Sequence, residues 1–248
     1  MKKIFGFIGM WLMAMTLCCS FMACSSDDGE EERSEGVNGA PGVNGDGKRL
    51  VSITTIYHEI NSSMERRFEY DKHGRIVRDI NDERTTTYEY GETKIIATTR
   101  NVFLGGSITR REYSLKNGRI VKSTTDYGTS VSNEEYEYDG NKLLNKGTLH
   151  MINSDIITWD GDNIATWGDN VYIYSNLESS IGWHDCYDIS YEDEVLLNQG
   201  YFGARPRNLV ATAGWRGGGI PDKYKYEVND GYVTKKVTDN VTTEYVWE

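Results

Sequence analysis

One short stretch of the chain brings together the residue types of a nucleophilic site. In "WHDCYD", His184, Cys186 and Asp188 alternate, so an extended backbone would place all three side chains on one face. A cysteine nucleophile needs its general base within hydrogen-bond reach, whereas residues two apart on a strand lie about 6 to 7 Å apart at Cα. The spacing therefore favours a half-buried thiol that packs as a small hydrophobic side chain, and we predict no catalytic residue here.

Carboxylates and histidines offer two further kinds of chemistry. A glycosidase needs two carboxyl groups in distinct environments, but the glutamates recur regularly and so indicate the solvated face of a repeat. These glutamates include Glu69, Glu89, Glu112 and Glu137. The remaining histidines, His58, His73 and His150, have no metal-ligand spacing, so we expect no metal and no cofactor.

Aromatic and arginine side chains that suit ligand binding are frequent between residues 159 and 216. Flat aromatic faces stack on sugar rings or cover a lipid, and a guanidinium binds a carboxylate or a sulfate. The alternative is that the rings are ordinary core and the arginines pair with the abundant acids. The candidate ligand-binding residues are Trp159, Trp167, Trp183, Tyr201, Phe202, Arg205, Arg207, Trp215 and Arg216.

A repeated β-hairpin must position these residues. The stretch "FEYDKHGRIVRDI" (68–80) returns as "REYSLKNGRIVKS" (111–123). Aromatic-ended runs precede turns about every 20 to 25 residues, a spacing that accommodates two strands and two turns. Aromatic residues alternate with charged ones along each run, so one face of each strand is aromatic and the other charged. The aromatic-to-glycine spacing is four residues at Tyr70 and five at Tyr113 and Tyr226, which predicts differing registers.

Joined end to end, the hairpins predict an all-β antiparallel meander of about 12 to 15 strands over residues 49–248. Side chains alone fill a closed barrel of about eight strands, so we expect a large curved sheet or an open barrel with something inside it. The repeat breaks between Ser175 and Pro221. There "SYEDEVLLNQ" predicts a short helix with Ser190 as N-cap and Gly200 as its stop. We expect this helix and its loops to plug the sheet, with the ligand site where plug and strands meet.

The N-terminal residues predict export. Lys2 and Lys3 precede an apolar run from Ile4 to Met22, and Ala23 stands directly before Cys24. This pattern resembles a bacterial lipoprotein signal, and the resemblance implies that residues 1–23 are removed and that Cys24 carries lipid. The alternative is an uncleaved membrane anchor. Residues 24–48 are acidic and poor in large apolar side chains, which predicts a flexible tether.

Charge and cysteine content exclude two classes of interaction. Without residues 1–23 the chain has 25 basic and 38 acidic residues, a net charge of −13, which disfavours nucleic acid as a partner. Cys186 is the single cysteine that follows Cys24, so no disulfide can form within the domain.

Two resemblances rest on these motifs. The Tyr-Asp-turn-Gly-Arg-Ile pattern is similar to the YD repeats of large bacterial surface and toxin shells. The acidic cluster after Cys24 resembles the surface-export signal of Bacteroidota lipoproteins. Together with the hairpins and "GYFGARPRNL", it resembles a Bacteroidota surface lipoprotein family of unknown function with a porin-like β fold. The resemblance implies a barrel-like domain on the outer face of the outer membrane, with no assigned activity. A membrane-spanning barrel is the alternative, disfavoured by charge on both faces of the first hairpin.

The sequence therefore predicts a lipid-anchored, surface-exposed outer-membrane protein that binds a ligand without catalysis. We expect a glycan or a lipid as that ligand. A structural module that interacts with an envelope protein is the second hypothesis, and a hydrolase is the third.

Overall fold

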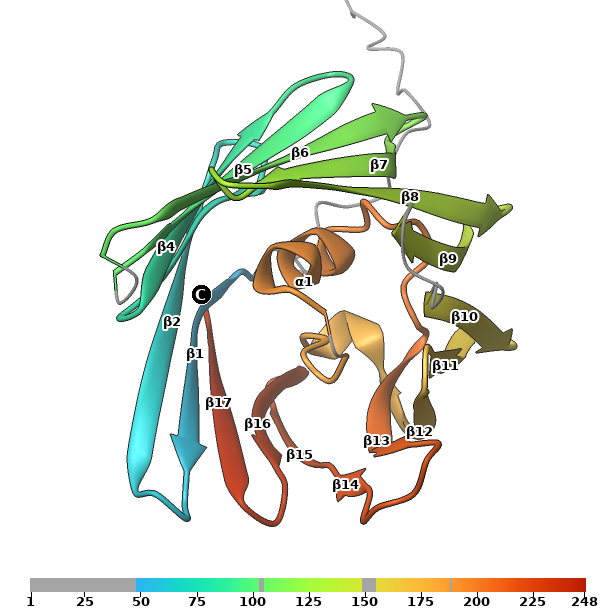
Figure 1. Ribbon diagram of the computed structural model, residues 1–248. Helices are drawn as coiled ribbons and strands as arrows, with labels where there is room; N and C mark the ends of the chain where they lie inside the picture. The colour runs from blue at the N-terminus through green and yellow to red at the C-terminus, as the bar shows by residue number, and fades with distance from the viewer. Residues whose placement is uncertain (1–47, 103–104, 149–154, 188) are drawn as a thin grey trace, which may run out of the picture. The chain divides into compact units, whose positions relative to one another are not determined.

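The computed structural model describes residues 48–102, 105–148, 155–187 and 189–248, which form one antiparallel sheet wound into a nearly closed barrel (Figure 1). Consecutive strands pair from β1 to β14, and β17 returns to pair with β1. The predicted meander of hairpins is confirmed, and its sheet has 17 strands where the sequence predicts 12 to 15.

The first nine strands are β1 (Leu50–Tyr57), β2 (Ser62–Tyr70), β3 (Ile76–Asn81), β4 (Arg84–Tyr90), β5 (Lys94–Asn101), β6 (Ile108–Lys116), β7 (Arg119–Asp126), β8 (Val131–Asp139) and β9 (Lys142–Thr148). The remaining elements are β10 (Asp155–Asp160), β11 (Asn163–Trp167), β12 (Asn170–Glu178), the 3-10 turn η1 (Ser179–Ile181), α1 (Tyr191–Asn198), β13 (Asn208–Trp215), β14 (Asp222–Lys223), β15 (Lys225–Asn229), β16 (Tyr232–Val237) and β17 (Val241–Trp247).

The strand pairing of the barrel changes at Tyr224, the one residue between β14 and β15. β14 pairs with β13, and β15 pairs with β16. The Tyr224 amide donates to Ala211 O at 2.8 Å. β14 and β15 are therefore two halves of one extended stretch that changes neighbour at Tyr224.

Five of the strand-ending aromatic residues each fasten their strand to the preceding one. An aromatic side chain at the end of one strand donates a hydrogen bond to a backbone carbonyl near the start of the strand before it. The bonds are Tyr70 Oη to Leu50 O (2.7 Å), Tyr90 Oη to Ile76 O (2.6 Å), Tyr138 Oη to Ile120 O (2.6 Å), Trp159 Nε1 to Leu143 O (2.8 Å) and Trp247 Nε1 to Val233 O (2.8 Å). The aliphatic residues that supply these carbonyls are all buried, so the repeat gives every such ring both a packing surface and a polar partner.

The spacing anomaly at Tyr113 has a simple cause. The register shifts between Glu69 and Tyr70 in the first hairpin, and between Ser114 and Leu115 in the third. Leu115 therefore stands at the position of Tyr70, and Tyr113 takes an inner position. Tyr113 is fully buried and its hydroxyl donates to Asp193 Oδ1 of α1 at 2.9 Å.

α1 lies inside the barrel (Figure 1), with Ser190 Oγ accepting a hydrogen bond from the Asp193 amide as the predicted N-cap. The loop that follows α1 covers one end of the barrel. Tyr201 O accepts from the Ile120 amide (2.9 Å), the Ala204 amide donates to Asn141 O (2.6 Å), and the Arg207 amide donates to Asp162 O (3.0 Å). We call this the capped end; β7, β9 and β11 begin there.

The three acids in the first turn of α1 bind strands of the barrel wall, and Glu194 also binds Trp183 in the segment before α1. Their contacts are Glu192 with Thr99 (2.6 Å), Asp193 with Tyr113 (2.9 Å) and Lys146 (3.0 Å), and Glu194 with Arg66 (2.6 Å) and Trp183 (2.6 Å). Asp193 and Glu194 are buried, so the plug is held by desolvated charge pairs as well as by Val195, Leu196 and Leu197, which are also buried.

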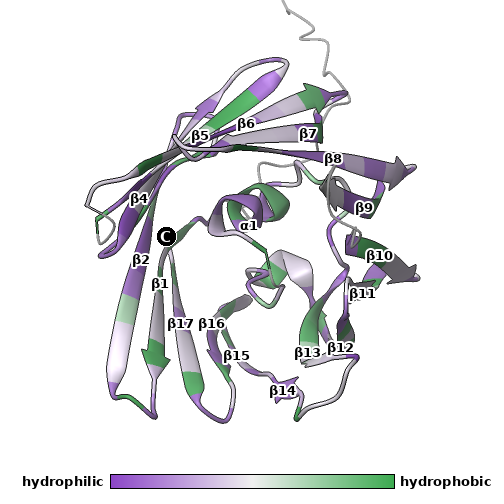
Figure 2. Ribbon diagram, in the orientation of Figure 1, coloured by the Kyte–Doolittle hydropathy of each residue, from purple (hydrophilic) through white to green (hydrophobic). Residues whose placement is uncertain are grey.

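The first hairpin carries charge on both faces, as predicted. Arg66 and Asp79 point into the barrel and pair there, whereas Arg78 and Glu69 pair on the exposed outer face. Figure 2 shows hydrophilic and hydrophobic positions interspersed along the strands. Across the described residues no helix is long and apolar enough to cross a membrane.

Candidate functional site

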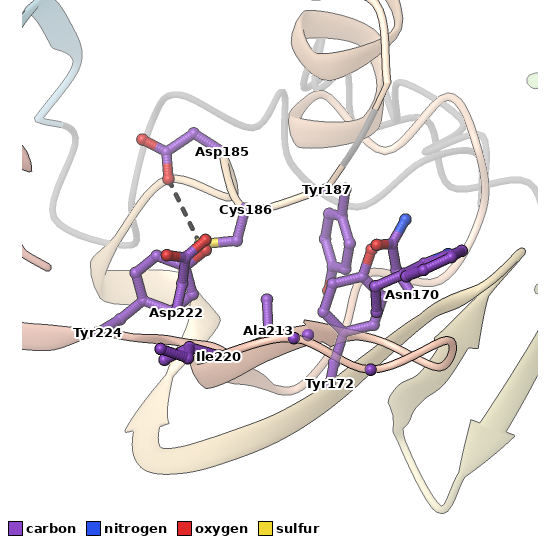
Figure 3. A pocket seen from close by; sticks show the side chains of 13 residues that line it. Asn170, Tyr172, Asp185, Cys186, Tyr187, Ala213, Ile220, Asp222 and Tyr224 are labelled. Atoms are coloured by element: carbon purple, nitrogen blue, oxygen red, sulfur yellow. Dashed lines mark hydrogen bonds between the residues drawn. The ribbon is translucent and has the colours of Figure 1, made fainter.

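A cavity of about 480 Å³ opens where the segment before α1 meets β12, β13 and β14 (Figure 3). We call it the rim cavity, because Trp215 and the loop after it lie at the end of the barrel opposite the capped end. Its lining residues are Asn170, Tyr172, Asp185, Cys186, Tyr187, Ala213, Gly214, Trp215, Gly218, Gly219, Ile220, Asp222 and Tyr224.

Aromatic rings form two walls of the rim cavity. Tyr172 and Tyr187 lie together on one side, edge to face with ring centroids 4.9 Å apart, and Tyr224 lies on the other side beside Cys186 and Asp222. Tyr172 and Tyr187 are buried through most of their surface, so their positions are fixed by packing.

Trp215 is the exposed tryptophan among those in the described residues. It is 60% exposed, whereas Trp167 and Trp183 are at most 5% exposed. The glycine-rich loop after β13 explains its position, because a Cβ at Gly217 would approach the indole ring of Trp215 to 2.3 Å. Only glycine at 217 lets the loop fold back against the indole.

The polar groups of the rim cavity differ in whether the protein already binds them. Asp185 is engaged, because it forms an ion pair with Lys236 and accepts a hydrogen bond from Tyr245 Oη at 2.8 Å. Asp222 is exposed and Asn170 half-buried. Asp222 and Asn170 therefore supply the acceptor and donor groups that a polar ligand can reach.

Cys186 lies in the rim cavity as an inert thiol. Burial raises its pKa to about 12, although the charge of Lys236 acts in the opposite direction. Its Sγ lies 3.6 Å from Asp185 Oδ1 and 4.0 Å from Tyr226 Oη. A thiol with so high a pKa carries almost no thiolate at neutral pH, so it is a poor nucleophile.

His184 does not act as a base for Cys186. Burial lowers the pKa of His184 to about 3, and the charge of Arg205 lowers it further. The segment has no strand structure, and no hydrogen bond joins His184 to Cys186 within the described residues; Asp188 lies outside them. Nor do the described residues contain a group of three or more His, Cys, Asp or Glu side chains that could hold a metal ion.

Of the nine candidate ligand-binding residues, Trp215 alone lines the rim cavity. Five others pack inside the barrel or against its hairpins, where Phe202 contacts Tyr136, Tyr201 contacts Tyr90, and Trp167 contacts Tyr187. Trp159 and Trp183 complete that group through the hydrogen bonds described above.

The three candidate arginines differ in exposure. The Arg205 guanidinium is enclosed in protein and donates to Ser179 O at 3.1 Å, while Arg207 and Arg216 are exposed. Sequence reasoning missed Tyr172 and Tyr224, whose alternation in "NVYIYS" and "DKYKYE" has the same form as the structural repeat. It also missed Tyr187, which directly follows Cys186 in "WHDCYD". Cys24, His150 and residues 1–47 lie outside the described residues.

Comparison with known proteins shows which solved structures have a similar fold. No protein-family profile and no curated protein sequence matches the chain. Among solved structures, a porin-like protein from Bacteroides uniformis ATCC 8492 aligns with TM-score 0.62 at 15% identity, over 80% of this chain and 96% of that one. A porin-like protein from Bacteroides vulgatus ATCC 8482 aligns with TM-score 0.56 at 13% identity, over 80% of this chain and 98% of that one. This likeness confirms the porin-like β fold; lipid anchoring and kinship to YD repeats stay predictions.

Proposed function

We propose that the chain is a cell-envelope lipoprotein whose barrel binds a glycan in the rim cavity without catalysis. The observation that carries the proposal is the exposed indole of Trp215 beside a cavity with two further aromatic walls and accessible polar groups. A solvent-exposed aromatic face next to hydrogen-bonding groups suits a sugar ring, which is apolar on its faces and polar at its edges.

A glycan fits the cavity better than a lipid does. Asp222 and Asn170 stand in its wall, and a carboxylate facing an acyl chain would lose hydration without gaining a partner. A sugar hydroxyl offers such a carboxylate a donor. The lipid alternative therefore ranks second for this cavity.

The direction of the cavity supports capture of a ligand from outside the membrane. β1 begins at the capped end, since Leu50 lies beside Glu69 and Tyr70, whose hairpin turns there. The segment that precedes residue 48 joins the barrel at that end. The tether to a lipid on Cys24 would therefore join the capped end, and the rim cavity lies at the opposite end of the barrel.

The outer face supports a barrel that stands outside the hydrocarbon core. Arg67 and Glu65 pair there, and so do Arg78 and Glu69, all of them exposed. Charges on the lipid face of a membrane barrel cost about 2 to 4 kcal/mol each near the midplane for arginine. Anchoring by lipid rather than by the strands is consistent with this surface.

The two other hypotheses find less support in the geometry. Docking of a partner by strand addition needs an unpaired edge, and among the described strands only the short β14 and β15 pair on one side alone, β14 with β13 and β15 with β16. A hydrolase needs an activated nucleophile and a base in reach of it, which Cys186 and His184 do not provide.

A glycan array tests the proposal. We expect the full-length chain, purified in a neutral detergent, to bind a restricted set of glycans, and Trp215→Ala to lose that binding. Trp159→Ala is the matched control, because its indole is bonded to Leu143 O away from the rim cavity. No binding above background, or equal binding by the Trp215→Ala and native proteins, would overturn the proposal.

A further inference from the structure

The charged side chains that line the rim cavity are all negative. Asp185 and Asp222 supply two carboxylates, and no lysine, arginine or histidine of the described residues lines the space. A negatively charged glycan would therefore meet repulsion in this cavity and find no counter-charge. Without residues 1–23 the chain also has a net charge of −13, which favours the approach of cations.

The protein itself neutralises one of the two carboxylates. Buried Lys236 forms the ion pair with Asp185 described above, and its Nζ lies 5.4 Å from the centre of the Tyr224 ring. This distance is within the range of a cation–π interaction. Behind the rim cavity, one ammonium group of the chain thus already contacts both a carboxylate and an aromatic ring.

Asp222 supplies the second carboxylate, and it has no such counter-charge. No ion pair and no side-chain hydrogen bond holds it among the described residues. An exposed, solvated carboxylate is ordinary on a protein surface. The position of Asp222 in the sheet is what distinguishes it from other exposed acids.

Strand register places Asp222 beside the aromatic walls of the rim cavity. Ala213 of β13 lies opposite Tyr172 of β12 on one side and opposite Asp222 of β14 on the other. All three side chains therefore point to the face of the sheet that lines the cavity, with the methyl group of Ala213 as the floor between the other two (Figure 3). Trp215 follows two residues after Ala213 on the same face, about 7 to 8 Å diagonally from Asp222 at Cα.

We propose that the rim cavity selects an amino sugar with a free, protonated amine, an inference that rests on the glycan binding proposed above. The ammonium group of the sugar binds Asp222 through a charge-assisted hydrogen bond, and the apolar face of the sugar ring stacks on Trp215. Asn170, opposite Trp215 in the register, binds a neighbouring hydroxyl group. An acetylated amine has no charge and an acidic sugar has the wrong charge, so both bind more weakly.

Titration calorimetry with three trisaccharides of the same linkage tests the proposal on the full-length chain in neutral detergent at about pH 6, where primary amines are protonated. The trisaccharides are those of glucosamine, N-acetylglucosamine and glucose, which differ in one substituent of each ring. We expect the glucosamine trisaccharide to bind at least tenfold more tightly than the other two. This advantage should shrink as the salt concentration rises, because salt screens an exposed ion pair.

Two variants each remove one carboxylate. Asp222→Asn should bind the glucosamine trisaccharide at least tenfold more weakly and the glucose trisaccharide as the native chain does, because the substitution removes the charge and keeps the shape. Asp230→Asn is the matched control and should keep the preference for glucosamine. Asp230 is exposed in the turn between β15 and β16, outside the rim cavity, and asparagine suits its positive φ of 49°.

The outcomes separate this inference from the proposed function. Equal binding of the three trisaccharides, or an unchanged preference in Asp222→Asn, would overturn the inference. If Trp215→Ala still weakened that equal binding, the proposed glycan site would stand and the preference for an amine alone would fail. No binding of any trisaccharide would also overturn the inference, and together with a glycan array without signal it would overturn the proposed function as well.

Discussion

Arg66 on β2 and Asp79 on β3 form a buried bidentate pair, and Arg66 also donates to Glu194 of α1 at 2.6 Å. Two hairpin strands and the plug therefore share one guanidinium inside the barrel. Removing one partner of a buried ion pair leaves the other charge desolvated and unpaired, which costs about 3 to 5 kcal/mol.

Arg66→Met should therefore lower the free energy of unfolding by about 3 kcal/mol or more, because both Asp79 and Glu194 lose their hydrogen bonds to the Arg66 guanidinium. Urea denaturation followed by tryptophan fluorescence measures the change. Arg67→Met is the control: this neighbouring arginine is exposed and should cost less than about 1 kcal/mol. Equal loss of stability in the two variants would contradict the role given to the inner pair.

The stability of the barrel should fall on mild acidification because of His184. Its pKa is about 3 in the folded chain, against an ordinary pKa of 6.5 for histidine, so near pH 5 the unfolded chain binds a proton that the folded chain does not. The free energy of unfolding should then decrease by about 2 kcal/mol between pH 7.5 and pH 5.0 from this group alone. Urea titrations at both pH values, compared with His184→Phe, isolate the effect; an unchanged pH dependence in the variant would contradict it.

Tyr138→Phe tests the hydrogen bond that recurs at the ends of the hairpins. The substitution keeps the ring and removes the donor to Ile120 O, so it should cost about 1 to 2 kcal/mol. Tyr127→Phe, at a tyrosine that is 53% exposed, should change stability by less than about 0.5 kcal/mol. Thermal denaturation of the two variants side by side measures the difference. If Tyr138→Phe left the stability unchanged, the recurring aromatic residues would stabilise the hairpins through packing alone.

Cys186 should react slowly with iodoacetamide. With a pKa of about 12 its thiolate fraction at pH 8 is lower than that of a free cysteine by roughly a thousandfold, so alkylation should be at least roughly a hundredfold slower. Mass spectrometry of the peptide that contains Cys186 follows the reaction, with the chain unfolded in urea as the reference. Rapid modification in the folded chain would restore the nucleophile hypothesis.

Local signals in the sequence were sufficient for the repeat and the plug. Alternation of Phe68, Glu69 and Tyr70 predicts an inner and an outer face, and the turn glycines Gly74 and Gly231 have positive φ (77° and 80°), as the turn chemistry requires. Ser190 caps α1, and the helix ends two residues before Gly200. These features depend on residues close together in the chain.

The strand count and the site depend on contacts between distant residues. β14 has two residues, which is too short for a sequence pattern, and β11 and β12 share two paired positions, so no local pattern reveals how they pair. Asp193 and Glu194 read as ordinary first-turn acids, because nothing local shows that Arg111 and Arg66 face them across the barrel. Trp215 and Trp183 look alike in sequence, and only the tertiary structure exposes one and buries the other.

Gly217 offers a way to move Trp215 without removing it. A methyl group at 217 would overlap the far edge of the indole, so Gly217→Ala should displace the ring from the rim cavity while the barrel stays folded. Calorimetric titration of the best glycan from the array, performed on the native chain, Trp215→Ala, Gly217→Ala and Trp159→Ala, tests the central claim most directly. Binding by the native chain and Trp159→Ala, with at least tenfold weaker binding by both other variants, is the predicted result. Unchanged affinity in Trp215→Ala and Gly217→Ala would show that the ligand binds elsewhere and contradict the account.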